Sequence, residues 1–380
     1  MKLKNKLTFL LILVIMSQIL LLFCSKKGEN FVEIIRENFQ TVIDGKTTDL
    51  YTLKNSNGII IKITNYGGKI VQILVPGRDG NLGDIVLGYE TIDGFINGSP
   101  SMGALIGRYA NRIANGKFEL NGKTYTLATN NGPNHLHGGN KGFRFKVWDA
   151  KQIDDQTLQL SYLSIDGEEG YPGNLIVKVT YTLTNEDELK IDYYAVTDKS
   201  TVLNLTNHAF FNLAGQGNSL VLDHEVLINA DFFTPTDKTN IPTGKITPVK
   251  GTPFDFTQTT KIGARINNDD EQLKFGNGYD HNYVVNKSDD PLTFAARVYE
   301  PTTGRVMKVF TTEPGIQLYT GNSLSDKDIG KAGKKYPARS AFCLETQHYP
   351  DSPNQTNFPT TVLNPGEEFK SITVYKFSVN

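Results

Sequence analysis

The sequence has little cysteine, little tryptophan and almost no net charge. Its two cysteines are Cys24 and Cys343, among 380 residues. Cys24 stands at the end of an N-terminal apolar run typical of a secretory signal, which is cleaved on export. Cys343 therefore has no second cysteine to pair with in the mature domain. No intramolecular disulfide can then stabilise the protein, although export would place it where disulfides form. Its stability must come from a packed core.

The charge balance excludes several classes of partner. The chain has 39 Lys and Arg residues against 40 Asp and Glu residues, a formal net charge of -1 at pH 7. It therefore lacks the basic footprint of a nucleic-acid-binding protein and has no long tail of like charges. We expect a small, neutral partner rather than a nucleic acid, and the sequence leaves the oligomeric state open.

The residue pattern predicts an all-β fold, a large antiparallel β-sandwich. There is no internal repeat and no low-complexity linker. Its 17 Tyr, 21 Phe and 35 Gly residues favour strands and turns. Apolar runs recur between turn signals, and Asn121-Gly122 indicates a hairpin. The runs at 157–162, 174–181 and 189–196 are expected to be adjacent antiparallel strands; further strands are expected at 59–64, 69–75, 283–285, 293–299, 306–310 and 373–377.

The first 24 residues have the layout of a secretory signal, with lysines followed by an apolar run. Cys24 at its end, followed by Ser25 and Lys26, resembles the acylated cysteine of a bacterial lipoprotein, although Phe23 is bulkier than the residue usual there. We expect export to the periplasm or to a lipid anchor in a bacterium. An uncleaved anchor is the alternative, since 7–23 is near the shortest span of a bilayer. Residues 25–40 are expected to be a spacer before a domain at 41–380.

Most of the six histidines stand beside turn residues, which favours loops that carry a site. His135 and His137 would share a face of an extended segment, as two metal ligands could. No carboxylate or third histidine follows with ligand spacing, so we predict no metal. His208, in a polar segment between apolar residues, suits a core histidine and a general acid equally.

Three charged residues also have two readings each. Glu345 ends an apolar run; it is either a solvated strand end or a buried carboxylate with the raised pKa that a base near neutral pH needs. Asp280, beside glycines, either holds a ligand's hydroxyls or caps its own backbone. Arg112 either donates to sugar oxygens or forms a structural ion pair.

Taken together, the motifs resemble the aldose 1-epimerase (galactose mutarotase) family, in the same order over nearly the whole chain from about Thr41 to Val379. The resemblance implies the β-sandwich of that family, with a hexose in an open cleft and no cofactor. The matching segments are 65–68, 107–113, 136–139, 206–208, 278–281, 314–322, 344–347 and 365–368.

By that resemblance Glu345 would be the base that removes the anomeric proton and His208 the acid that protonates the ring oxygen. Rotation of the opened aldehyde and reclosure would give the other anomer of glucose or galactose. His137 would assist His208. The remaining hydroxyls would be bound by Asn111, Arg112, Asp280 and Gln317.

Three rival functions are weaker. A carbohydrate-binding protein without activity would not need both Glu345 and His208. A polysaccharide hydrolase or lyase would need a pair of carboxylates. A sugar-phosphate epimerase should have extra cations in its cleft, and only Arg108 and Arg112 in the matched segments qualify.

Overall fold

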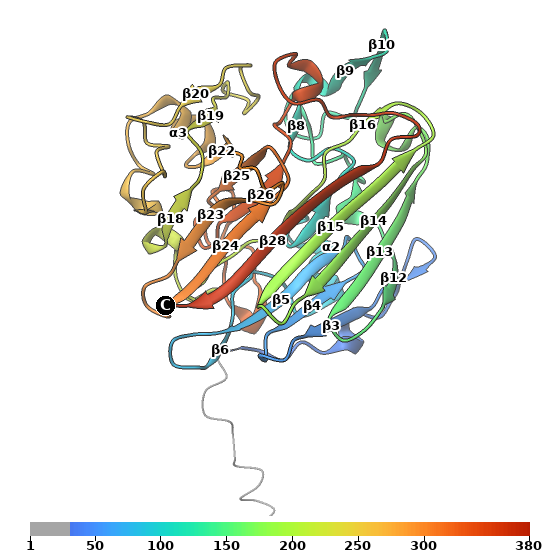
Figure 1. Ribbon diagram of the computed structural model, residues 1–380. Helices are drawn as coiled ribbons and strands as arrows, with labels where there is room; N and C mark the ends of the chain where they lie inside the picture. The colour runs from blue at the N-terminus through green and yellow to red at the C-terminus, as the bar shows by residue number, and fades with distance from the viewer. Residues whose placement is uncertain (1–30) are drawn as a thin grey trace, which may run out of the picture.

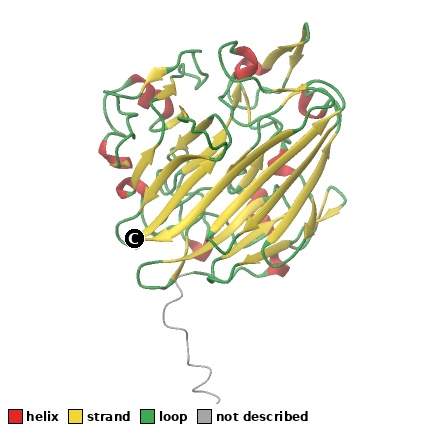
Figure 2. Ribbon diagram, viewed as in Figure 1, coloured by secondary structure: helices red, strands yellow, loops and turns green. Residues whose placement is uncertain are grey.

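The computed structural model describes residues 31–380, and these form two layers of β-sheet (Figure 1). The predicted signal segment and Cys24 lie outside the described residues. Within them strands dominate, and the helices are short pieces around the sheets (Figure 2). The helices are α2 (Ile92–Asn97), α3 (Glu271–Gly276) and the 3-10 turns Arg36–Phe39, Ala114–Gly116, Phe143–Phe145, Glu168–Gly170, Val221–Asp223, Ile262–Ala264, Lys331–Gly333 and Ser352–Asn354.

One layer is a nine-stranded antiparallel sheet of long strands, seen as the diagonal ribbons in Figure 1. The three runs predicted to be neighbours pair in sequence order, as expected. In spatial order the strands are β12 (Asp149–Gln152), β13 (Thr157–Ser164), β14 (Leu175–Leu183), β15 (Glu188–Thr197), β28 (Phe369–Val379), β24 (Arg305–Thr311), β23 (Thr293–Tyr299), β18 (Glu225–Ile228) and β21 (Thr260–Lys261).

The other layer is built from smaller sheets. Four strands form one sheet and five form another, and the second of these contributes to the cleft described below. The four are β3 (Leu50–Lys54), β4 (Ile60–Thr64), β5 (Lys69–Pro76) and β6 (Leu82–Asp84). The five, in spatial order, are β20 (Thr247–Pro248), β19 (Phe232–Thr234), β22 (Asp280–Val284), β25 (Gly315–Tyr319) and β26 (Cys343–Gln347).

Five two-stranded pairs complete the fold, and two of them carry cleft residues. The Asn121-Gly122 hairpin is confirmed, as β9 pairs with β10. The pairs are β1 (Val42–Ile43) with β2 (Lys46–Thr47), β7 (Ala104–Ile106) with β17 (Thr206–His208), β8 (Arg112–Ile113) with β11 (His135–Leu136), β9 (Lys117–Leu120) with β10 (Lys123–Thr126), and β16 (Thr201–Val202) with β27 (Val362–Leu363).

The main core fills the space between the layers. Along β14 buried residues alternate with more exposed ones, so one face of the strand points inward. Val177, Val179 and Tyr181 on that face belong to the same apolar cluster as Ile61 and Ile73 of the four-stranded sheet. This packing agrees with a sandwich stabilised by its core. Cys343 is a buried free thiol.

The N-terminal part of the described chain packs against the body of the protein. Ile34 and Phe39 are buried, in a stretch that the sequence suggested to be spacer. The side chain of Lys62 donates to the Ile34 carbonyl over 2.6 Å. Among residues 31–380 no helix is both long and apolar enough to cross a membrane.

Candidate active site

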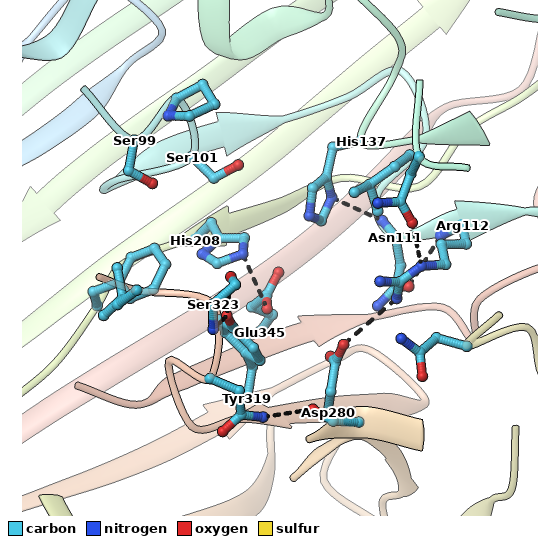
Figure 3. Close-up of a pocket in the computed structure, with 18 of the residues that line it drawn as sticks. Ser99, Ser101, Asn111, Arg112, His137, His208, Asp280, Tyr319, Ser323 and Glu345 are labelled. Carbon is cyan, nitrogen blue, oxygen red and sulfur yellow. Dashed lines mark hydrogen bonds and ion pairs between the residues drawn. The ribbon is translucent and has the colours of Figure 1, made fainter. Parts of the chain in front are cut away.

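A cleft with a cavity volume of about 560 Å³ lies where β8, β17, β22 and β26 meet. Six residues predicted from the sequence line it together, and Figure 3 shows their side chains converging. They are Asn111, Arg112, His137, His208, Asp280 and Glu345. The volume falls within the range of small-molecule sites.

Glu345 lies in the middle of β26, whose five residues are all buried. Its side chain reaches the cleft, but only 2% of the residue is exposed. Oε2 is buried without a hydrogen-bond partner, and Oε1 lies 3.5 Å from Nε2 of His208. A carboxylate so poorly satisfied within the protein is suited to accept a proton or a hydrogen bond from a ligand.

His208 ends β17, which pairs with β7 and packs beside β26. This polar segment is buried because its amides satisfy backbone groups: Asn207 donates to the Gly103 carbonyl and Asn204 to the Ala110 carbonyl. The imidazole stacks on Phe210 with ring centroids 4.8 Å apart. Nε2 is thereby directed at Glu345 and the cleft.

Burial controls the protonation of this pair. Desolvation lowers the pKa of His208 to about 4, with a smaller contribution from the Arg144 charge. Desolvation also raises the pKa of Glu345 well above its usual value; Asp280 adds to the rise and Arg112 opposes it. Burial therefore disfavours both charged forms and favours a pair that carries one proton.

His137 presents a hydrogen-bond donor to the cleft. Its Nδ1 accepts from the backbone N–H of Asn111 over 3.2 Å, so in the neutral ring the proton is on Nε2. Burial and the neighbouring His208 hold its pKa well below the usual value, which keeps the ring neutral. The two imidazoles meet edge to face at 5.3 Å.

His135 does not share a face with His137, contrary to the sequence expectation. His137 has a φ of 53°, and this left-handed backbone turns its side chain away from the direction that extended geometry would give. His135 instead binds the Tyr171 hydroxyl and the Ala128 carbonyl, both at 2.7 Å. Gly138 follows with a positive φ, and a Cβ at this position would collide with the Gly107 carbonyl.

The polar wall opposite the pair is held by Asp280. Its Oδ1 accepts from Nε2 of Gln317 over 2.7 Å, and its Oδ2 lies 3.6 Å from Nη1 of Arg112. Arg112 also donates from Nε to the Asn131 side chain over 3.1 Å. Gln317 is 2% exposed and does not line the cleft, so it contacts Asp280 from behind.

Arg108 lies away from the cleft. Its guanidinium is buried and donates to the hydroxyl and carbonyl of Ser164 and to the carbonyls of Ile165 and Pro172, at 2.7–2.9 Å. These donors are committed to the fold. Of the two cations considered for a phosphate, only Arg112 reaches the cleft.

The fold creates a possible set of metal ligands that sequence spacing did not indicate. One ligand atom each from His137, His208 and Glu345 lies within 4.8 Å of the others. Two histidines and a carboxylate are a ligand type that binds zinc. These residues come from three separate strands or turns, so a search for short ligand spacings would miss them.

Several lining residues were not among the predictions. Phe210 and Tyr319 border His208, with Tyr319 6.1 Å from the imidazole ring. Tyr319 lies in 314–322, one of the segments that resemble the family, so the sequence did contain a signal that could have identified it as a cleft residue. Ser99, Ser101 and Arg144 lie in loops or short turns without a sequence pattern of their own, and only the tertiary structure brings them to the cleft.

Comparison with known proteins gives one consistent family. The sequence model described as "Aldose 1-epimerase" matches residues 49–376. The galactose mutarotase of Bos taurus is 46% identical over 85% of this chain and 92% of its own, and the aldose 1-epimerase of Escherichia coli is 36% identical over 88% and 96%. The crystal structure of the galactose 1-epimerase from Lactobacillus acidophilus superimposes with a TM-score of 0.79 at 30% identity, covering 92% of this chain and 98% of its own.

Proposed function

The chain belongs to the aldose 1-epimerase family, and we propose on this basis that it interconverts the α and β anomers of free hexoses such as glucose and galactose. It is an isomerase, and the cleft around Glu345 and His208 is its proposed active site. The roles of individual residues given below are part of the proposal.

The proposed reaction is acid–base ring opening. Glu345 removes the proton of the anomeric hydroxyl while His208 protonates the ring oxygen, and the bond between C1 and the ring oxygen breaks. The bond between C1 and C2 then rotates, so that the other face of the aldehyde meets the hydroxyl of C5. Reclosure with the two groups in reversed roles returns both protons and gives the opposite anomer.

The proposed proton transfers require one proton shared by His208 and Glu345. Ring opening starts from the arrangement with the proton on His208 and the negative charge on Glu345. After opening, the proton is on Glu345 and the imidazole is neutral. Because burial disfavours both charges, the cost of the starting arrangement is offset by the attraction between the groups, 3.5 Å apart, and by the bound hydroxyls.

The other cleft residues are proposed to align the sugar. The neutral His137 ring donates from Nε2 near the ring oxygen, and Asn111 offers its side-chain amide. Arg112 and Asp280 bind the hydroxyls farther from C1, with Asp280 held by Gln317. Fixed partners of this kind keep the reacting atoms within reach of the acid and base.

The observation that carries the proposal is the buried, unsatisfied Glu345 carboxylate beside His208. The test follows the optical rotation of freshly dissolved α-D-glucose and α-D-galactose with the purified protein. Glu345→Gln is the test variant. Glu313→Gln is the matched control, because Glu313 is also buried and also contacts a histidine, His348, but does not line the cleft.

We expect the parent and Glu313→Gln to accelerate equilibration and Glu345→Gln to lose nearly all of this acceleration. If the parent equilibrates neither sugar faster than buffer does, the proposed reaction is wrong. A carbohydrate-binding protein without catalytic activity is then favoured. If Glu345→Gln remains as active as the parent, the proposed base is wrong although the reaction stands.

We also propose that the protein is exported and that Cys24 is acylated. This proposal rests on the sequence of residues 1–24, which lie outside the described structure. The test is labelling of expressing cells with a fatty-acid analogue, with Cys24→Ala as the control. Label on the parent alone supports the anchor, and label on neither chain rejects it.

A further inference from the structure

The cleft extends past His208, away from the residues proposed to bind the sugar hydroxyls. Figure 3 shows Ser99 and Ser101 on one side of His208 and Asp280 and Arg112 on the other. Arg144 lines the same cleft and approaches Ser101, with 3.4 Å between its Nη1 and the hydroxyl oxygen. Neither the acid–base pair nor the residues proposed to bind the hydroxyls lie at this far end of the cleft.

Arg144 is a buried cation with few partners. It is 7% exposed, its Nε has no hydrogen-bond partner, and its other contacts are long, at 3.4 Å to the Ser101 hydroxyl and 3.4 Å to the Gly139 carbonyl. A guanidinium has five N–H donors, so most of its capacity is unused. A buried cation with so few close partners is suited to bind an anion in the cleft that it lines.

The surroundings of Arg144 do not neutralise it. Among residues 31–380 no carboxylate lies within ion-pair distance of its guanidinium. Glu169 is the one carboxylate that affects its pKa, and both oxygens of Glu169 already accept from the backbone of Asn140 and Lys141. Burial lowers the pKa of Arg144 only to about 10, so it is charged at neutral pH.

A second cation lies behind the same wall. The Lys69 side chain is fully buried and donates to the Pro100 carbonyl over 2.8 Å, between the rings of Tyr66 and Phe95. Desolvation, with the Arg144 charge, lowers its pKa to about 7. Asp328 also lines the cleft, but its Oδ1 accepts from the Tyr89 hydroxyl. Arg144 is therefore the group that offers free donors here.

The proposed reaction decides which part of a sugar would meet Arg144. In that reaction the ring oxygen would lie at His208 and the anomeric hydroxyl at Glu345. C5 is bonded to the ring oxygen on the side opposite C1, and C6 is its substituent. Arg112 and Asp280, which are proposed to hold the other hydroxyls, lie on the opposite side of His208 from Ser101 (Figure 3), so this orientation would direct C6 toward Ser101 and Arg144.

We propose that the cleft accepts aldoses with an anionic group at C6, a carboxylate or a phosphate ester, and that Arg144 is the residue that determines this specificity. The inference rests on the proposed function, because it uses the same acid–base pair and the same orientation of the sugar. A planar guanidinium can bind either anion with two N–H donors. The Ser99 and Ser101 hydroxyls are further donors at the same end.

The test measures kcat/KM for three substrates, D-glucose, D-glucuronate and D-glucose 6-phosphate, after subtracting the rate in buffer. Arg144→Gln removes the charge, and Arg144→Lys keeps it. Arg297→Gln is the matched control, because Arg297 lies on β23, outside the residues that line the cleft. The readout is the ratio of kcat/KM for each anion to that for glucose, which cancels any effect on the shared acid–base pair.

We expect Arg144→Gln to lower this ratio by about 10- to 100-fold for the anion that the site binds. A change of this size corresponds to the loss of one charge-assisted hydrogen bond. Arg144→Lys should restore part of it, and Arg297→Gln should leave it unchanged. A fall for glucuronate alone identifies the carboxylate, a fall for glucose 6-phosphate alone identifies the phosphate, and a fall for both identifies an anion site of low selectivity.

The inference is overturned if the parent turns over glucose but neither anion. It is also overturned if Arg144→Gln lowers kcat/KM equally for all three substrates. In both cases the proposed mutarotation stands. If the parent does not accelerate glucose but does accelerate one of the anions, the substrate of the proposed function is wrong and the anionic class stands. Acceleration of none of the three sugars contradicts both.

Discussion

Nε2 of His208 on β17 lies 3.5 Å from Oε1 of Glu345 on β26, in a pocket that leaves almost no surface of either residue exposed. The two strands belong to different sheets and meet through packing. This arrangement places a proton acceptor and a proton donor within reach of the same small ligand.

The acid–base pair should matter more to turnover than any residue that only holds the sugar. We expect His208→Asn and Glu345→Gln each to lower kcat by about 10²- to 10⁴-fold, the usual contribution of a positioned acid or base. Gln317→Leu should act mainly on KM, because Gln317 contacts Asp280 and does not line the cleft. Polarimetry over a range of hexose concentrations separates the two effects, and a larger kcat loss in Gln317→Leu would contradict this ranking.

The pH profile of kcat/KM should be broad. Activity requires one proton on the His208–Glu345 pair. A second proton binds only near the lowered pKa of His208, about 4, so the acid limb should lie there rather than near the usual histidine value. Burial raises the pKa of Glu345, so the pair keeps its one proton up to higher pH than an exposed carboxyl would. An acid limb near pH 6.5 would contradict this account.

Added zinc should inhibit the enzyme in competition with the sugar. The ligand atoms of His137, His208 and Glu345 lie within 4.8 Å of one another and would be occupied by the ion. We expect turnover to survive prior chelation, because proton transfer suffices for ring opening. Rates after treatment with a chelator, and again with zinc at several glucose concentrations, provide the measurement; lasting loss on chelation would show that a metal is required.

A buried ion pair should dominate the stability of one corner of the fold. Nζ of Lys331 lies 2.6 Å from Oδ2 of Asp84 and also donates to the Val71 and Val86 carbonyls. Lys331→Met should lower the free energy of unfolding by about 3–5 kcal/mol, because Asp84 is left as a buried charge without its partner.

The measurement is urea unfolding at neutral pH. Lys261→Met, which breaks the solvent-exposed pair with Asp223, is the control and should change stability little. The double variant Lys331→Met with Asp84→Asn should recover part of the loss, because no uncompensated charge remains. Equal effects of the two lysine variants would contradict the prediction.

His348 should make stability depend on pH. Burial alone would lower its pKa, but the Glu313 carboxylate, 2.6 Å from Nδ1, raises it above the usual value. A histidine with a raised folded pKa stabilises fully below its unfolded pKa of about 6.5, and this contribution is lost as the pH rises through the folded value. His348→Gln should therefore cost more stability at pH 5.5 than at pH 8.5 in paired thermal melts. A cost independent of pH would show that the pair is not charged.

Much of the fold could be predicted because strand periodicity is local. The alternation along 174–181 and 189–196 gave both strands and their antiparallel pairing, and Asn121-Gly122 gave its hairpin. The pairing of β15 with β28 joins distant parts of the chain, and no local pattern specifies it. For the same reason, the local sequence around His208 did not distinguish a core histidine from a general acid.

By itself, the sequence determined the all-β class and, through its motifs, the family and six residues of the cleft. Only the tertiary structure decided that His137 turns into the cleft while His135 turns away, because a single left-handed residue reverses the direction that extended geometry predicts. The tertiary structure also shows that Arg144 lines the far end of the cleft and that Arg108 is buried in the core. Side-chain direction depends on backbone angles and on contacts between distant segments, and residue order does not encode these locally.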